Sequence, residues 1–350
     1  MKQLMKGNEA MAEAAVRADC QMYVGYPITP QSEIVEYMSS RMPELGRIFV
    51  QSESELISIN TVIGGALTGK RCMTSSSGVG ISLMQEGLSD AFAKGLPMLL
   101  INVDRCSCGM GGDFGGSTDD YLRDTRGGGN GDYHFIVYVP NTVQEAVDLV
   151  YEAWDVAEKY RNPVEIMTEG RLGQMMETVE FPEFKKGPEK LDWASDGTTK
   201  PLGEYQPMPL DDAACKRRID RMREAEQRWE MYRVEDAETV IVACGLASRV
   251  CMGAIDELRE KGVKIGMLRV ISAWPFPIKG FAELPACVKR IACIEVDNDG
   301  QVIEDVLITT KKLKKFRNTP IYNYYQLHLF TPETVEEFIN GVLEGKIEEV

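Results

Sequence analysis

The chain has 350 residues, 44% of them hydrophobic, and carries 39 Lys and Arg against 54 Asp and Glu, a net charge of −15. This length predicts roughly two domains that each bury a core. The negative charge disfavours nucleic acid and anionic membranes as partners. No apolar run approaches the roughly 20 residues of a membrane span, and the start lacks a signal-peptide core, so we expect a cytoplasmic protein.

Strand and helix patterns alternate along residues 1–180, which we expect to form the first domain. The apolar run at 98–103 is typical of a strand buried in a parallel sheet. The alternation predicts an open α/β fold. The expected helices span 7–18, 30–42, 54–69, 79–94 and 142–160, and the expected strands span 22–26, 48–51, 71–75, 98–103, 135–140 and 163–169.

A Gly-dense segment at 104–132 interrupts this pattern, and loops of such length are usually functional or disordered. Residues 181–233 predict a surface linker followed by a charged helix at 211–233. Residues 234–350 predict a smaller α/β domain. Its expected strands span 239–245, 264–270 and 290–296, and its helices span 248–261, 300–312 and a last one that Thr331 caps before Pro332.

Nine cysteines include one close pair, Cys106 and Cys108, and no CxxC motif. Iron–sulfur clusters and zinc sites need thiolates at tighter, repeated spacing, so we expect reduced thiols and no metal on this chain. A redox or local metal role of the close pair is the alternative. The only two histidines, His134 and His328, exclude a three-histidine metal site.

The stretch GYPITPQSEIVEY, residues 25–37, runs from a strand end into a helix start. Thr29 can cap the helix with its side-chain oxygen, while Pro30 pre-sets the first turn. In open α/β sheets, however, this edge is also where ligands bind, and a helix start offers N–H groups to an anion. These residues are therefore compatible with a plain cap and with a ligand site.

Glu55 begins an otherwise apolar helix, where its carboxyl group can be partly desolvated. A desolvated carboxyl can keep or share a proton at neutral pH, which is a condition for acid–base work. Alternatively Glu55, like Glu53, is an acid that the helix dipole favours. A nearby strand-to-helix turn offers hydroxyls that either line a pocket or cap a helix. This turn consists of Ser75, Ser76, Ser77 and Gly78.

Glu55 and Gly64 have the nine-residue spacing of the pyrimidine-binding domain of thiamine diphosphate enzymes, where the Gly permits close packing. A longer series of motifs resembles, in order, the α subunits of 2-oxoacid:ferredoxin oxidoreductases. It is most similar to the VorB-type subunit of the branched-chain (3-methyl-2-oxobutanoate, or 2-ketoisovalerate) enzymes. The motifs are MKGNEAMAEAAVRA (5–18), YPITP (26–30), TSSSGVGISLMQEG (74–87), INVDR (101–105), TRGGGNGDY (125–133) and WPFP (274–277).

This resemblance implies a pyrimidine-binding-type domain with a parallel sheet and a smaller transketolase C-terminal-like α/β domain. It also implies that Glu55 activates the cofactor, while Thr29 and Arg105 bind the carboxylate of the 2-oxo acid. Arginine suits this role because its guanidinium can engage both carboxylate oxygens. The alternative for Arg105 is an ion pair with Asp104 or Asp113. The residues expected to line the cofactor pocket are Pro27, Ile28, Ser76, Ser77 and Gly78.

The implied reaction converts a 2-oxo acid, CoA and oxidised ferredoxin to acyl-CoA, CO₂ and reduced ferredoxin. The 350 residues contain no GDG motif for Mg²⁺ and the diphosphate, and no cluster ligands. The resemblance therefore implies a β subunit that supplies the Mg²⁺ site and a [4Fe–4S] cluster, together with γ and ferredoxin-like δ subunits. The active site would then lie between chains, and the second domain would serve assembly or lie near CoA.

Two departures leave alternatives open. Residues 106–118, CSCGMGGDFGGST, differ from the Gly- and Pro-rich loop expected of branched-chain members, so 2-oxoglutarate, pyruvate or an aryl 2-oxo acid stays possible as substrate. The segment 125–133 either approaches a ligand with its backbone or makes tight turns. Outside the family, the alternatives are a non-ferredoxin thiamine enzyme subunit and a non-catalytic scaffold subunit.

Overall fold

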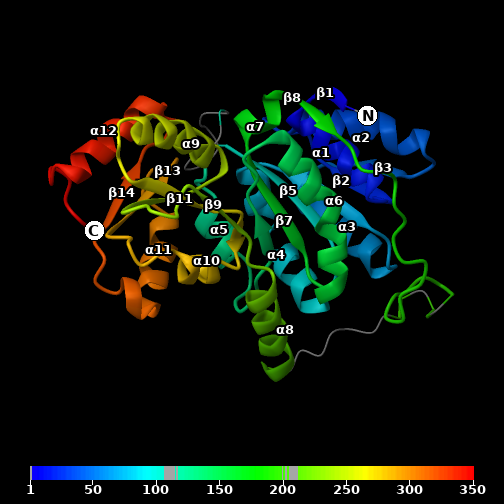
Figure 1. Cartoon of the computed structure of the whole chain (residues 1–350). Coiled ribbons are helices and arrows are strands. Elements are labelled where there is room, and N and C mark those ends of the chain that lie inside the picture. The colour runs from blue at the N-terminus through cyan, green and yellow to red at the C-terminus, as the bar shows by residue number, and fades with distance from the viewer. Residues whose placement is uncertain (1, 106–114, 116, 199, 202, 205–211) are drawn as a thin grey trace.

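The computed structural model describes residues 2–105, 115, 117–198, 200–201, 203–204 and 212–350. Two open sheets lie side by side, one built mainly by the first half of the chain and the other by the second half (Figure 1). Among the described residues, none of the helices combines the length and the apolar character that a membrane span requires.

The first sheet has the strand order β12-β6-β7-β5-β4-β2-β3 in the described part of the chain. Neighbouring strands are parallel, except that β12 pairs antiparallel with β6. Parallel strands buried on both faces are rich in apolar side chains, such as Leu99, Leu100, Ile101 and Val103 in β5. The strands are β2 (Met22–Gly25), β3 (Ile48–Gln51), β4 (Cys72–Ser76), β5 (Leu99–Asp104), β6 (Ile136–Tyr138), β7 (Val164–Glu169) and β12 (Ser272–Trp274).

Helices cover both faces of this sheet, because right-handed crossovers in opposite directions place helices on opposite sides. Helix α1 (Gly7–Arg17) packs with α2 (Ser32–Glu44) and α6 (Val143–Tyr160), while α3 (Glu55–Leu67) packs with α4 (Val79–Lys94). The remaining elements of this half are α5 (Tyr121–Arg126), α7 (Gly170–Gln174) and an antiparallel pair, β1 (Lys2–Lys6) with β8 (Met176–Glu180).

The second sheet has the order β14-β13-β10-β11-β9, and only its edge strand β9 is antiparallel to its described neighbour. Helix α8 projects from the lower edge of the molecule (Figure 1). The strands are β9 (Trp229–Tyr232), β10 (Thr239–Cys244), β11 (Ile265–Val270), β13 (Arg290–Glu295) and β14 (Ile321–Tyr325). The helices are α8 (Asp212–Ala225), α9 (Gly245–Glu260), α10 (Ile278–Glu283), α11 (Val302–Lys312), α12 (Pro332–Leu343) and the short 3₁₀ helix η1 (Lys314–Phe316).

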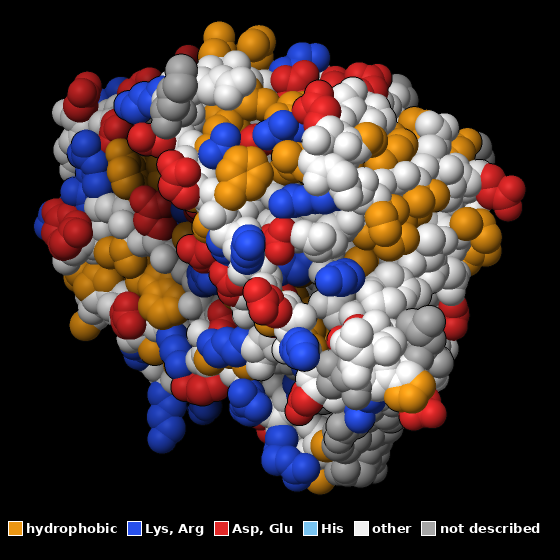
Figure 2. Space-filling view, turned by 90° about the vertical axis from the view of Figure 1, so that its right-hand side faces the viewer, with side chains coloured by type: hydrophobic (Ala, Val, Ile, Leu, Met, Phe, Trp, Pro, Cys, Tyr) orange, Lys and Arg blue, Asp and Glu red, His pale blue; other side chains and the backbone are white. Residues whose placement is uncertain are grey.

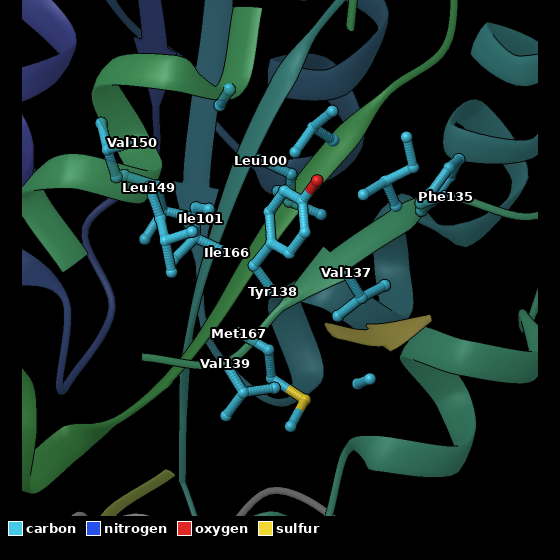
Figure 3. Packing of buried hydrophobic residues seen from close by; sticks show 14 of the residues in the cluster. Leu100, Ile101, Phe135, Val137, Tyr138, Val139, Leu149, Val150, Ile166 and Met167 are labelled. Carbon is cyan, nitrogen blue, oxygen red and sulfur yellow. The ribbon is translucent and has the colours of Figure 1, made fainter. Parts of the chain in front are cut away.

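One hydrophobic core runs from the first sheet into the second half of the chain. In its centre, Leu149 and Val150 of α6 lie beside Ile101 of β5 and Ile166 of β7 (Figure 3). A separate core lies under α9 and α12. The two halves are therefore joined by continuous packing.

The predicted α/β architecture is confirmed, and most predicted elements differ from the structure by one or two residues at their ends. Two predictions are wrong. The helix expected at 211–233 ends at Ala225, because residues 229–232 pair with β11 as a strand. The segment 104–132 is not loop throughout, since it contains α5. The division into 1–180, 181–233 and 234–350 stays a prediction.

Candidate active site

Three segments that carry predicted site residues follow neighbouring parallel strands at the same sheet edge. Residues 26–30 follow β2, residues 77–78 follow β4, and Arg105 follows β5. These strands are adjacent in the order β5-β4-β2. Because parallel strands end at a common edge, the sheet brings these segments together where open α/β folds bind ligands.

Glu55 is the first residue of α3, as predicted, and is only 4% exposed. The preceding Ser54 caps the helix by accepting a hydrogen bond from the N–H of Ile57 at 3.4 Å. The carboxyl group is thus fixed at a capped helix start. A Cβ added at Gly64 would meet no described atom within 4 Å. The close packing expected at Gly64 is therefore not made within the described part of the chain.

Gly80, which was not predicted, leaves space that the side chains of Glu55 and Ser76 both approach. A Cβ at Gly80 would lie 2.5 Å from Oε1 of Glu55 and 2.0 Å from Oγ of Ser76. Both distances are well below van der Waals contact, so a larger residue at position 80 would displace both side chains. The signal in the sequence is a second glycine directly after the predicted turn, in SSSGVG.

The strand-to-helix turn after β4 has the predicted position and buries two hydroxyls. Ser76 and Ser77 are fully buried, and neither side-chain oxygen has a hydrogen-bond partner among the described residues. Gly78, the N-cap of α4, has a φ of 46°, which favours glycine. Ser75 is different, because its hydroxyl contacts Tyr23 at 2.8 Å and donates to Gln31 at 2.6 Å.

Arg105 and Thr29 are brought into contact. Nη1 of Arg105, a residue that is 6% exposed, donates to the backbone carbonyl of Thr29 at 3.3 Å. The side chain of Thr29 is exposed, as is Pro27, whereas Ile28 is half-buried. Of the two alternatives for Thr29, the plain helix cap is not observed, because the N-cap of α2 is Gln31. A hydrogen bond from the N–H of Gln31 to the carbonyl of Ile28 closes a turn first, and α2 begins at Ser32.

A buried group of acids lies directly beside this edge and was not predicted. Arg123 pairs with Asp120 and Asp124, and its Nη1 donates to the carbonyl of Gly78 at 3.0 Å. Asn102 of β5 donates to Asp124 at 2.8 Å and to Asp120 at 3.2 Å. The group therefore ties α5 to β5 and to the turn that precedes α4. Its signal is the alternation of acids and arginines in TDDYLRDTR.

Burial opposes ionisation of the carboxyls in and beside this group. Burial and the neighbouring acids raise the pKa of Asp104 and of Glu165, and burial also raises the pKa of Asp124 against the opposing charge of Arg123. The described His, Cys, Asp and Glu residues form no group of three or more that could hold a metal.

The glycines of TRGGGNGDY approach a helix of this chain. The N–H of Gly128 donates to the side chain of Gln85 at 2.9 Å, and a Cβ at Gly129 would lie 2.3 Å from the backbone oxygen of Gln85. Tyr133 donates to the same side chain at 3.0 Å. The contacts give the segment a packing role on α4. Cys106, Cys108, Asp113 and most of the segment 106–118 lie outside the described residues.

Comparisons with known proteins identify the family of this chain. Residues 13–240 match the family described as pyruvate flavodoxin/ferredoxin oxidoreductase, thiamine diphosphate-binding, and residues 237–332 match pyruvate:ferredoxin oxidoreductase core domain II. The chain is 40% identical over 314 residues to ketoisovalerate oxidoreductase subunit VorB of Methanothermobacter thermautotrophicus, covering 87% of this chain and 88% of that protein. It is 32% identical over 374 residues to 2-oxoglutarate synthase subunit KorA of Methanocaldococcus jannaschii, covering 97% and 99%.

Solved structures show the same fold. A 2-oxoglutarate:ferredoxin oxidoreductase from Magnetococcus marinus superposes with a TM-score of 0.83 at 23% identity over 97% of this chain, which spans 65% of that protein's chain. A split-gene transketolase superposes with a TM-score of 0.60 at 14% identity over 98% of this chain and 99% of its own. The predicted fold, a pyrimidine-binding-type domain with a transketolase C-terminal-like domain, is confirmed. By family match and by identity to its relatives, the chain belongs to the α subunits of the 2-oxoacid:ferredoxin oxidoreductases.

Proposed function

We propose that this chain is the α subunit of an enzyme that oxidatively decarboxylates a branched-chain 2-oxo acid, 3-methyl-2-oxobutanoate, to acyl-CoA and CO₂ with reduction of ferredoxin. The observation that carries the proposal is that buried Glu55 and Ser76 both approach Gly80 of α4, while Arg105 contacts the backbone carbonyl of Thr29 at the same sheet edge. The VorB relative supports the branched-chain substrate. The KorA relative makes 2-oxoglutarate the second candidate.

The residues around Glu55 fit the pyrimidine ring of thiamine diphosphate. When bound, this cofactor supplies the nucleophilic carbon that attacks the 2-oxo group. Glu55 would share a proton with the ring nitrogen of the aminopyrimidine. The buried hydroxyls of Ser76 and Ser77, which lack partners among the described residues, would gain polar partners from a ligand. Three further residues would form the pocket wall, namely Pro27, Ile28 and Gly78.

Thr29 and Arg105 would hold the carboxylate of the 2-oxo acid. A buried guanidinium makes strong, directional hydrogen bonds to a carboxylate, and Thr29 is an exposed residue at the same edge. The contact between Arg105 and the carbonyl of Thr29 would keep both donors on one side of the substrate. The remaining part of the 2-oxo acid would then extend toward Glu55 and the cofactor.

A partner chain would complete this site. Apolar side chains beside Glu55 are exposed on α3 and α4, namely Leu56 (45%), Ile57 (42%) and Leu83 (53%). Figure 2, which views the side of the molecule that carries β3 and α2, shows hydrophobic side chains gathered in patches among charged ones. Exposed apolar patches of this kind mark interaction surfaces.

We assign this surface to a β subunit that carries the Mg²⁺ and diphosphate site and a [4Fe–4S] cluster, because the sequence has no GDG motif. The complex would also contain γ and ferredoxin-like δ subunits, and CoA would be its second substrate. The seven described cysteines that are free thiols, Cys20, Cys72, Cys215, Cys244, Cys251, Cys287 and Cys293, are consistent with a cytoplasmic enzyme.

The deciding experiment is an anaerobic assay of the native complex, in which reduction of ferredoxin or a viologen is followed with CoA and a panel of 2-oxo acids. Preference for 3-methyl-2-oxobutanoate is the expected result. Preference for 2-oxoglutarate or pyruvate would keep the reaction class and overturn the substrate. Absence of activity with every 2-oxo acid would overturn the proposed function.

A further inference from the structure

Two side-chain amides from distant parts of the sequence converge on the loop that carries Thr29. Nδ2 of Asn8 donates to the carbonyl of Pro30 at 2.8 Å, and Nε2 of Gln174 donates to the same carbonyl at 3.4 Å. The two amides also donate to the two carboxylate oxygens of Glu33, at 2.9 and 2.8 Å. Asn8 and Gln174 thus donate hydrogen bonds to the same backbone carbonyl and to the same carboxylate. We refer to these two residues as the amide clamp.

Two glycines allow the amide clamp to form. A Cβ at Gly7 would lie 2.1 Å from the carbonyl oxygen of Leu172, and a Cβ at Gly173 would lie 2.4 Å from Oδ1 of Asn8. Each glycine therefore permits the start of α1 and the helix α7 to touch. Asn8 is fully buried at this contact, so its amide has a fixed position.

Glu33 makes the amide clamp a charged interaction. Partial burial opposes ionisation of Glu33, but hydrogen bonds from Gln174 and Asn8 and the charge of Lys6 outweigh it and lower the pKa of this carboxyl. Glu33 is therefore ionised at neutral pH, and hydrogen bonds to an ionised acceptor are roughly twice as strong as neutral ones.

The same loop is held at two further carbonyls. Nε2 of Gln31 donates to the carbonyl of Tyr26 at 3.0 Å, and Arg105 donates to the carbonyl of Thr29. The backbone from residue 26 to residue 30 is thus held at both ends and at Thr29. The hydrogen bonds of the amide clamp fix the carbonyl of Pro30, the residue that follows Thr29.

We propose that Asn8 and Gln174 are positioning residues for substrate binding, which fix the carbonyl of Pro30 so that Thr29 stays against Arg105. This inference rests on the proposed function, in which Thr29 and Arg105 hold the substrate carboxylate. In this proposal, neither member of the amide clamp would touch the substrate. Without the clamp, the loop must be ordered when substrate binds, and this entropy cost weakens binding of the 2-oxo acid while leaving CoA unaffected.

The test compares Asn8→Ala and Gln174→Ala with Gln144→Ala in the assembled complex. Gln144 is a matched control, because its amide also bridges two elements, accepting from the N–H of Glu180 at 2.7 Å and donating to its carbonyl at 3.0 Å. We expect each clamp variant to raise the KM for the 2-oxo acid roughly five- to tenfold, as loss of a hydrogen bond implies. The KM for CoA, and all constants of the control, stay unchanged. Equal changes in both KM values, or none, overturn the proposal.

A second readout separates this inference from the proposed function. Amide hydrogen exchange of peptides that cover residues 26–33 is measured in the same complexes, and faster exchange is expected in both clamp variants but not in the control. Unchanged exchange overturns the amide clamp, and faster exchange with an unchanged KM overturns its role in substrate binding.

A wild-type complex that is inactive with all 2-oxo acids refutes the proposed function, while exchange still decides whether the clamp orders the loop. If Asn8→Ala fails to assemble, the exposed Gln174 carries the test.

Discussion

The guanidinium of Arg105 holds the backbone carbonyl of Thr29 at 3.3 Å, across 76 residues of sequence. The contact joins the segment after β2 to the end of β5, two strands that lie on either side of β4. The position of the Thr29 hydroxyl therefore depends on Arg105. A change at Arg105 is expected to disturb both groups that we assign to the substrate carboxylate.

Arg105→Lys should raise the KM for the 2-oxo acid by about tenfold, because lysine offers a point charge in place of a planar pair of donors. The KM for CoA should stay constant. Steady-state kinetics of the reconstituted complex with each substrate varied in turn measures both. Arg228→Lys, at a surface pair with Glu152, is the matched control. Equal effects on the two KM values would remove Arg105 from the carboxylate site.

Glu55→Gln should lower kcat by roughly 100-fold or more, because the amide keeps the shape of the side chain but cannot share a carboxyl proton. Assembly of the complex, followed by size-exclusion chromatography, should be unchanged. Glu53→Gln, an exposed change two residues earlier, serves as the control and should keep full activity. A Glu55→Gln complex with wild-type turnover would instead support a scaffold subunit.

Gly80→Ala should lower kcat without unfolding the chain, since the added Cβ would overlap the Oγ of Ser76 and Oε1 of Glu55 and push both side chains aside. The matched control is Gly131→Ala, where a Cβ meets no described atom within 4 Å. Activity and the thermal midpoint are measured for both. Wild-type turnover of Gly80→Ala would show that the position of Glu55 does not matter for the reaction.

Glu169 should make stability depend on pH. Burial raises the pKa of this carboxyl to about 8, although the N–H of Leu246, which donates to Oε2 at 2.9 Å, and the charge of Arg171 lower it. The folded chain therefore keeps a proton that the unfolded chain loses above a pKa of about 4.3. The stability contributed by Glu169 falls as pH rises between these values and is level above pH 8.

Glu169→Gln removes this titration and keeps an acceptor for Leu246. The stability of the variant relative to wild type should rise with pH by up to about 1.4 kcal/mol per unit between pH 5 and 8. Urea unfolding of both proteins at several pH values measures the difference. A difference that does not change with pH would contradict the raised pKa of Glu169.

Periodicity located most of the fold, because long amphipathic helices and apolar parallel strands carry their pattern in consecutive residues. Helix α4 was predicted with its observed bounds. Short elements could not be predicted from periodicity. The three residues of β12 show no period, and their pairing with β6 depends on contacts between segments far apart in sequence.

The candidate site residues also fall into those that a local motif indicates and those that only the fold brings together. Motifs singled out Glu55, Thr29 and Arg105 as candidate site residues, since each lies in a distinctive local sequence. The role of Gly80 depends on where α4 passes over Glu55, and the grouping of Asp104 with Glu165 depends on strand order. Neither relation can be predicted from a local stretch of residues, because each depends on how distant segments pack in three dimensions.

The antiparallel pairing of β12 with β6 limits how this protein can be divided. A truncation after residue 233 would remove β12 and uncover the edge of β6 together with part of the core that both halves share. Unprotected strand edges of this kind recruit other chains and promote aggregation. The second half therefore protects an edge of the first sheet, and residues 1–233 expressed alone are expected to aggregate.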